Sequence, residues 1–223
     1  MGARKRRNGV SLEIMRLTKF EHSCVLVDDG DARILIDPGG FSHGFETLTG
    51  LTAVLVTHQH PDHLDVDRLP ALLAANPDAT LYTDGASAAV LAESGIAATA
   101  VQPGERLHAG TSVDVFGGQH AVIHPDVPVI PNVAYLIGGR FLHPGDSFTI
   151  PDVDVEILGL PTAAPWLKAS ESADYLRALT PNVAIPIHEA LLAVPGFFYN
   201  LYEKLAPEET ELRVVAPGGT FEA

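Results

Sequence analysis

The amino-acid sequence predicts an α/β or α+β protein in which two packed sheets are flanked by helices. Short apolar runs that are typical of strands occur in both halves of the chain, and stretches with helical periodicity lie between them. The length of 223 residues fits one large domain or two small ones, and a hydrophobic content of 46% is enough for a sizeable core. No linker or low-complexity tract divides the chain. Strand-rich halves with helices between them favour an αββα sandwich.

The first half is expected to contain strands, a helix, a strand, a second helix and further strands. Residues 28–31 (DDGD) are a hairpin signal between the second and third strands. Asp65 or Asp67 can cap the first helix, and the second, over residues 84–93, is stopped by Gly95. The apolar stripe of the first helix consists of Leu69, Leu72 and Leu73. The expected strands are residues 15–20, 23–27, 32–36, 53–57, 80–82, 98–102, 105–108 and 111–117.

The second half is expected to repeat this arrangement loosely. Gly138-Gly139 is a hairpin signal between two strands. Ser170 is predicted to cap a helix that has Glu171 in its first turn and Arg177 in its last, which suits the helix dipole. The stripe of a last helix consists of Phe198, Leu201, Tyr202 and Leu205. The expected strands are residues 133–138, 140–143, 153–158, 183–187 and 212–216.

A cluster of potential metal ligands follows one of the predicted buried strands. The apolar run over residues 53–57 leads directly into His58-Gln59-His60-Pro61-Asp62-His63. Three imidazoles and a carboxylate suit zinc and similar divalent metals better than calcium or magnesium. The alternative is a polar loop whose histidines only cap neighbouring backbone groups. The hydrophobic context and the spacing together favour a metal site.

This motif and the residues downstream of it resemble the metallo-β-lactamase-fold hydrolases. The similarity is greatest to the short, single-domain branch that includes ascorbate-phosphate-lactonase-like proteins, and it covers about residues 15–217. It implies an αββα sandwich of the metallo-β-lactamase type, formed by one hydrolase domain over residues 15–223. It also implies that Asp37, at the end of the third strand, lies under the metal loop and orients it. A turn-forming role for Asp37 is the alternative, and the two are compatible.

The resemblance divides seven candidate ligands between two divalent ions. Three of them, His120, Asp146 and His188, follow later strands. The first ion is assigned to His58, His60 and His120, the second to Asp62, His63 and His188, and Asp146 bridges both. Zn²⁺ is expected, with Mn²⁺ or Fe²⁺ as alternatives. Such ions would hold a hydroxide nucleophile near neutral pH, with Asp62 and Asp146 as the catalytic carboxylates.

Other residues are weaker candidates for the site. His22 and His124 could line it or contact substrate, and His143 could lie behind the ligands, although a structural or solvated histidine is the alternative for each. Trp166, the single tryptophan, lies in a predicted loop and could pack on substrate. Lys168 in the same loop could meet an anionic group. Core packing and solvent exposure are the respective alternatives.

The composition excludes some functions and locations. A net charge of −14 argues against a grip on nucleic-acid phosphates, and no apolar run approaches the ~18 residues of a membrane span. A single cysteine, Cys24, suits a reducing cytoplasm. We expect residues 1–14, which carry four basic side chains, to be a disordered extension, or to precede a true start at Met15. The oligomeric state is left open.

The expected function is hydrolysis of a small ester, lactone or phosphodiester by a metal-held hydroxide. An iron-dependent oxygenase on the same fold is one alternative. A metal-binding protein without catalytic activity is the other.

Overall fold

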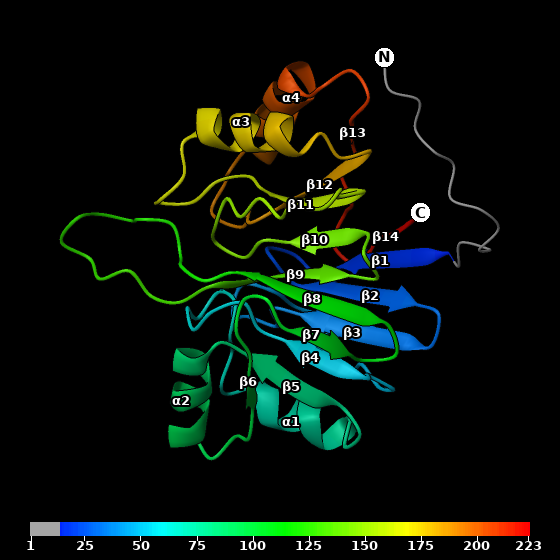
Figure 1. Cartoon of the computed structure of the whole chain (residues 1–223), viewed down its shortest axis with the longest axis vertical. Helices are drawn as coiled ribbons and strands as arrows, with labels where there is room; N and C mark the ends of the chain where they lie inside the picture. The colour runs from blue at the N-terminus through cyan, green and yellow to red at the C-terminus, as the bar shows by residue number, and fades with distance from the viewer. Residues whose placement is uncertain (1–13) are drawn as a thin grey trace.

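Two seven-stranded sheets pack face to face in the computed structural model, which describes residues 14–223. Helices α1 and α2 cover the outer face of one sheet, and helices α3 and α4 cover the outer face of the other (Figure 1). The predicted αββα sandwich is therefore confirmed. The extension expected over residues 1–14 lies outside the described residues, except for Ile14. In the described part of the chain, no helix is long and apolar enough to cross a membrane.

The first sheet has the strand order β14-β1-β2-β3-β4-β5-β6. Strands β14, β1, β2 and β3 pair antiparallel, and β3 to β6 pair parallel. Its strands are β1 (Met15–Lys19), β2 (Val25–Asp29), β3 (Ala32–Ile36), β4 (Ala53–Leu55), β5 (Thr80–Thr83), β6 (Thr99–Ala100) and β14 (Thr220–Glu222). The parallel strands are connected through α1 (Leu69–Ala75) and α2 (Gly85–Glu93).

The second sheet repeats the pattern, with the order β13-β12-β11-β10-β9-β8-β7. Strands β7 to β10 pair antiparallel, and β10 to β13 pair parallel. Its strands are β7 (Arg106–His108), β8 (Ser112–Gly117), β9 (Val133–Ile137), β10 (Phe141–His143), β11 (Ile157–Pro161), β12 (Val183–Ile187) and β13 (Glu211–Leu212). The helices of this half are α3 (Ala169–Leu179) and α4 (Pro195–Leu205).

The hydrophobic core forms three layers that hold the sandwich together. The central layer contains side chains from both sheets, such as Ile34 and Tyr135, and the two outer layers join each sheet to its helices. Tyr135 is fully buried, and its hydroxyl donates to the Val56 carbonyl at 3.1 Å. This hydrogen bond satisfies a polar group in the core, and it ties the second sheet to the end of β4, where the metal motif begins.

Three helix starts differ from the prediction. Helix α3 begins at Ala169, not after Ser170, and the Glu171 side chain accepts a hydrogen bond from the Lys168 amide at 2.9 Å. Helix α1 begins at Leu69, because the turn before it is separate: Asp65 accepts the amides of Asp67 and Arg68, each at 3.0 Å. Asp65 thus caps a turn and not the helix. By contrast, Asp84 caps α2, because its side chain accepts the amides of Ala86 and Ser87. The helix begins at Gly85, one residue after the predicted start.

Two predicted strands are misplaced. The strand expected over residues 153–158 begins at Ile157 in β11, where pairing with β10 starts at Phe141. The strand expected over residues 212–216 is replaced by β13 and β14, which belong to different sheets. A turn at Gly218 (φ +72°) carries the chain from one sheet to the other, so that β14 can pair with β1.

Two residues hold the loop after β3 against the loop after β4. The Arg68 guanidinium donates to the carbonyls of Gly39 and Ser42, each at 2.7 Å, and to the carboxylates of Asp65 and Glu46, each at 2.6 Å. Gly39 packs directly on the backbone of residues 58–63, the predicted metal-binding motif, which we call the metal motif. A Cβ atom at Gly39 would lie 1.8 Å from the backbone oxygen of Asp62. The metal loop can therefore sit where it does only because residue 39 has no side chain.

We predict that Gly39→Ala destabilises the protein, because the backbone of Asp62 and His63 must move to admit the methyl group. Overpacking of this kind costs about 1–3 kcal/mol, which for a chain of this size lowers Tm by roughly 2–10 °C. Thermal unfolding followed by circular dichroism measures the change. Gly85→Ala is the matched control: nothing lies within 4 Å of its Cβ position, so its Tm should stay the same or rise slightly. Equal Tm values for both variants would contradict the prediction.

Candidate metal centre

Loops from both sheets meet at one edge of the sandwich. Strands β1, β3, β4, β8, β10 and β12 all run toward this edge, as their pairing requires. Each is followed there by a candidate residue. These residues are, in strand order, His22, Asp37, His58, His120, Asp146 and His188. Rigid strands thus bring together residues that lie up to 166 positions apart in the sequence.

The candidate ligands fall into two groups. One consists of His58, His60, His120 and Asp146, and the other of His22, Asp62, His63 and His188. Within each group, one possible ligand atom per residue lies within 4.8 Å of all the others. Either group could hold a metal ion. His22 is the addition to the expected set, because the sequence placed it only among the weaker candidates.

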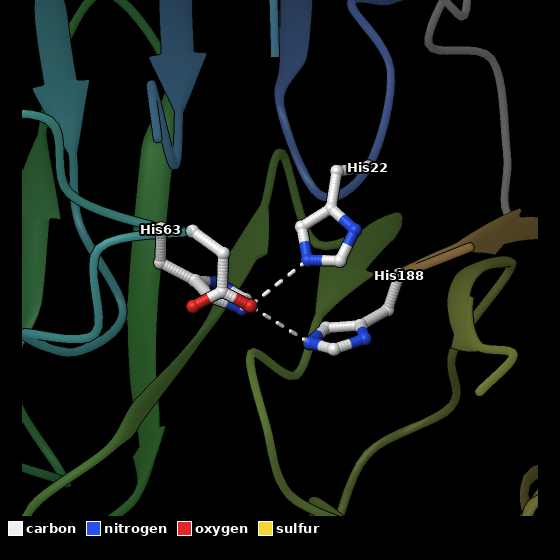
Figure 2. A group of neighbouring side chains, drawn as sticks. His22, His63 and His188 are labelled. Carbon is white, nitrogen blue, oxygen red and sulfur yellow. Dashed lines mark hydrogen bonds and ion pairs between the residues drawn. The ribbon is translucent and has the colours of Figure 1, made fainter. Parts of the chain in front are cut away.

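The second group surrounds the Asp62 carboxylate. The Nε2 atoms of His22 and His188 lie 3.0 and 3.4 Å from Asp62 Oδ2, and that of His63 lies 3.7 Å away. Figure 2 shows the three imidazoles pointing toward one another, although they come from the β1–β2 turn, the loop after β4 and the end of β12. His22 and His188 both have positive φ, at 38° and 63°. Such backbone is uncommon outside glycine and clusters at functional sites.

Asp146 lies between the two groups. Its Oδ1 is 3.0 Å from His63 Nε2, and its Oδ2 is 3.2 Å from His188 Nε2 and 3.3 Å from His120 Nε2. Trp166 donates its indole N–H to the same Oδ2 at 2.7 Å. The carboxylate therefore contacts members of both groups, which is the position expected of a bridging ligand.

Hydrogen bonds from outside orient the imidazoles. The Nδ1–H groups of His63, His120 and His188 donate to Asp37 Oδ2 at 2.7 Å, the Ala121 carbonyl at 2.5 Å and the Ala163 carbonyl at 2.8 Å. Their Nε2 atoms consequently face the centre. Among the described residues, these three Nε2 atoms and Asp146 Oδ1 are buried without a hydrogen-bond partner. Buried polar atoms are normally paired, so this orphaned set of nitrogen and oxygen donors fits divalent metal ions.

Asp37 lies in the turn directly after β3, where its carboxylate is surrounded by hydrogen-bond donors. It is fully buried with φ +48°, so it forms a turn in strained backbone. Its carboxylate also accepts the Thr57 amide at 2.7 Å, the Thr57 hydroxyl at 2.8 Å and the His63 imidazole at 2.7 Å. Asp37 thereby holds the start of the metal motif and one of its histidines at once.

The remaining candidates lie in different places. His143 is buried behind the centre, where its Nε2 donates to the Ser23 carbonyl at 2.8 Å. Trp166 lines the cavity beside the candidate ligands. His124 does not join the centre: its side chain is 62% exposed, and its Nδ1 accepts the Asp126 amide.

Some supporting residues gave no signal in the sequence. Asn132 accepts the Asp146 amide and donates to the Pro144 carbonyl, each at 2.9 Å, and so fixes the loop that carries Asp146. Lys19 is buried and paired with Glu189, which ties the residue after His188 to β1. Neither contact has a local pattern, because the partners come from distant strands.

Electrostatics separates the imidazoles into two kinds. Burial lowers the pKa of His22 to about 4 and also lowers the pKa of His58 and His60. For His188, burial is outweighed by the charge of Asp146 and by the close contacts of its Nε2 with the Asp146 and Asp62 carboxylates, which raise its pKa to about 9. The pKa of His63 is likewise raised, because Asp146 and Asp37 outweigh burial. Without a metal, these raised pKa values favour the protonated form of His63 and His188.

A cavity of about 210 Å³ opens above the candidate ligands. Its lining includes the candidate ligands His60, Asp62, His120, Asp146 and His188. The other lining residues are apolar, namely Phe41, Ile123, Pro165, Trp166 and Leu191. Its volume is below the ~300 Å³ of typical ligand pockets, so it suits a small molecule or one group of a larger molecule.

We predict that Zn²⁺ binding releases at least one proton at pH 7, because a metal must displace the protons on His63 or His188. The sign follows from the raised pKa: between about pH 6.5 and 9, the affinity for zinc should increase with pH. Titration calorimetry in two buffers of different ionisation enthalpy measures the released protons. The exposed His124→Ala variant should behave like the wild type. Binding without proton release, or affinity that falls with pH in this range, would refute the prediction.

Comparison with known proteins agrees with this geometry. The family model of the Beta-lactamase superfamily domain matches residues 16–188. Protein Rv0786c of Mycobacterium tuberculosis is 52% identical over 215 residues, which cover 93% of this chain and 100% of that protein. A UPF0173 metal-dependent hydrolase of Aeropyrum pernix is 27% identical and covers 93% of this chain and 97% of its own length.

A solved structure has the same architecture. Igni18, described as a novel metallo hydrolase from Ignicoccus hospitalis, superposes with a TM-score of 0.72 at 20% identity, over 94% of this chain and 98% of that one. At this identity the likeness concerns the fold, and it agrees with the two-sheet sandwich. The resemblance seen in the sequence is confirmed: this chain belongs to the β-lactamase superfamily and has the metallo-β-lactamase fold.

Proposed function

We propose that this protein is a hydrolase that uses two divalent metal ions, and that it cleaves a small ester, lactone or phosphodiester. One observation carries the proposal: Asp146, which belongs to one group of possible ligand atoms, also contacts His63 and His188 of the adjacent group. Its Oδ1 and the Nε2 atoms of His63, His120 and His188 are among the described atoms that are buried without hydrogen-bond partners. The hydrolase names of the relative in Aeropyrum pernix and of Igni18 support it. Zn²⁺ suits the imidazole-rich donor set, with Mn²⁺ or Fe²⁺ as alternatives.

In this proposal each residue group has one task. His58, His60 and His120 hold the first ion, whereas Asp62, His63 and His188 hold the second, with His22 as a further donor. When bound, such ions lower the pKa of water and so supply a hydroxide nucleophile near neutral pH. The protein fixes the ligand positions through Asp37 and the carbonyls that accept the imidazole N–H groups.

The two carboxylates remain ionised and oriented. Burial alone would raise the pKa of Asp146, but His63 and His188 outweigh it and keep the pKa well below the usual range. The Trp166 N–H donates a hydrogen bond to Oδ2 of Asp146. Hydrogen bonds with His188 and His22 likewise lower the pKa of Asp62 against the effect of burial. Asp62 can therefore accept a hydrogen bond from an attacking water and align it, which assists the attack on a carbonyl or phosphoryl centre.

We predict about two divalent ions per chain, measured by elemental analysis of protein purified without added metal. Asp146→Ala should lower the content of both ions, because its carboxylate contacts members of both groups. His124→Ala, which alters an exposed histidine, is the control and should retain both. At most one ion under metal-replete conditions, with Asp146→Ala unchanged, would rule out a dinuclear centre. Iron in place of zinc would favour the oxygenase alternative.

The proposed nucleophile makes a second prediction. His60→Ala and His63→Ala should each lower kcat/KM at least about 100-fold on an ester, lactone and phosphodiester panel, because each variant removes a ligand from a different group. Ser147, directly after Asp146, should be replaceable by Ala within about tenfold. Hydrolysis in ¹⁸O-labelled water should put the label into the product. A trapped acyl- or phosphoryl-enzyme would move the nucleophile to a side chain, and metal binding without any turnover would favour the catalytically silent alternative.

A further inference from the structure

We infer that the acyl group of the substrate is apolar and uncharged, so that the protein prefers neutral hydrophobic esters or lactones to esters with charged tails. This inference rests on the proposed hydrolase function and concerns the same cavity. It follows from the apolar residues that line the cavity beside the candidate ligands, and from the positions of the lysine and arginine side chains near the cavity.

Five of the ten residues that line the cavity are apolar, and we call them its apolar wall. Phe41, Ile123 and Leu191 come from the loops after β3, β8 and β12, so three loops each contribute an apolar side chain to the mouth of the cavity. Pro165 and Trp166 complete the wall. Phe41 is 42%, Ile123 37% and Leu191 56% exposed. Removing these surfaces from water would favour binding of a hydrocarbon group.

Among the described residues, no lysine or arginine lines the cavity. Two of the cations closest in the fold are paired with acids, since Lys19 pairs with Glu189 and Arg68 binds Asp65 and Glu46. Lys168, which the sequence offered as a contact for an anion, is exposed and does not line the cavity. Proteins that recognise phosphate or carboxylate groups usually supply Arg, Lys or a helix N-terminus. A charged tail would lie here against carbon atoms.

The chemistry is balanced without a further reactant. Water adds across the bond between the carbonyl carbon and the ester oxygen. The carbon gains the hydroxyl, that bond breaks, and the leaving oxygen takes the proton. The polar carbonyl of the substrate would face the candidate metal ligands, and its acyl chain would face Phe41, Ile123 and Leu191. A lactone fits the same arrangement, because its acyl chain and its leaving oxygen belong to one ring.

Binding can be measured independently of turnover, because Trp166 is the only tryptophan and lines the cavity. Its fluorescence in the zinc-loaded full chain is titrated with butanamide, hexanamide, the monoamide of adipic acid and 6-aminohexanamide. Hexanamide should bind up to about 15-fold more tightly than butanamide, since each buried methylene contributes about fourfold. The anionic and the cationic amide should each bind at least tenfold more weakly than hexanamide.

A pair of variants tests the role of the wall. Leu191→Lys places a cation at the mouth and should improve binding of adipic monoamide about tenfold relative to hexanamide. Val153→Lys is the matched control, because Val153 is similarly exposed at 48% but does not line the cavity. It should leave the ratio unchanged. Equal shifts in both variants would show a general effect of charge and would overturn the inference.

The outcomes also separate this inference from the hydrolase proposal. If hexanamide binds but no ester or lactone is hydrolysed, the apolar site stands and the proposed function fails. If adipic monoamide binds as tightly as hexanamide, the inference fails, and the hydrolase proposal is decided by its own tests. If none of the amides changes Trp166 fluorescence at saturating concentration, the inference is also wrong.

Discussion

The buried carboxylate of Asp37 is the contact on which the rest of the centre depends. It lies at the end of β3, and it binds the backbone and side chain of Thr57 after β4 as well as the imidazole of His63. One side chain thus fixes the position of residues 58–63 relative to the sheet, and it also orients the candidate ligand His63. Because a carboxyl group is costly to bury without hydrogen-bond partners, this network requires all three donors together. The close approach of Gly39 to Asp62 then leaves the loop little freedom.

The second constraint is that the site belongs to both halves of the sandwich. Each half contributes antiparallel strands followed by parallel ones, and the carboxyl ends of the parallel strands share one edge. Asp146 from the second half reaches His63 from the first, and Asp62 from the first reaches His188 from the second. A shift of one sheet against the other would separate these atoms. The central layer of apolar side chains joins both sheets. It therefore also sets the distances between the candidate ligand atoms of the two halves.

The sequence was most informative where spacing and strand context coincide. The motif from His58 to His63 carries its own signal, and the family resemblance placed His120, Asp146 and His188 at strand ends where the structure has them. His22 was underestimated, because its approach to Asp62 depends on pairing between β1 and β2 and on strained backbone in the turn between them. The split of the expected last strand into β13 and β14 was also hidden, since the decisive partners lie near opposite ends of the chain. No local sequence pattern predicted the apolar residues that line the cavity, because they come from separate loops.

The pairing of β14 with β1 has a consequence for the solution behaviour of the protein. Strand β14 pairs with the middle of β1, and residues on either side of β14 pair with its ends. Met15 and Ala223 exchange backbone hydrogen bonds at 3.0 and 2.9 Å, and Lys19 bonds the backbone of Gly218 and Gly219. Strand β1 would otherwise be the edge of its sheet, and it is longer and more buried than the three-residue strand that covers it. Open edges of that kind recruit strands from other molecules. The turn at Gly218 and strand β14 therefore protect β1 from pairing with other molecules. Removing them would promote aggregation, and this effect would precede any change at the distant histidines.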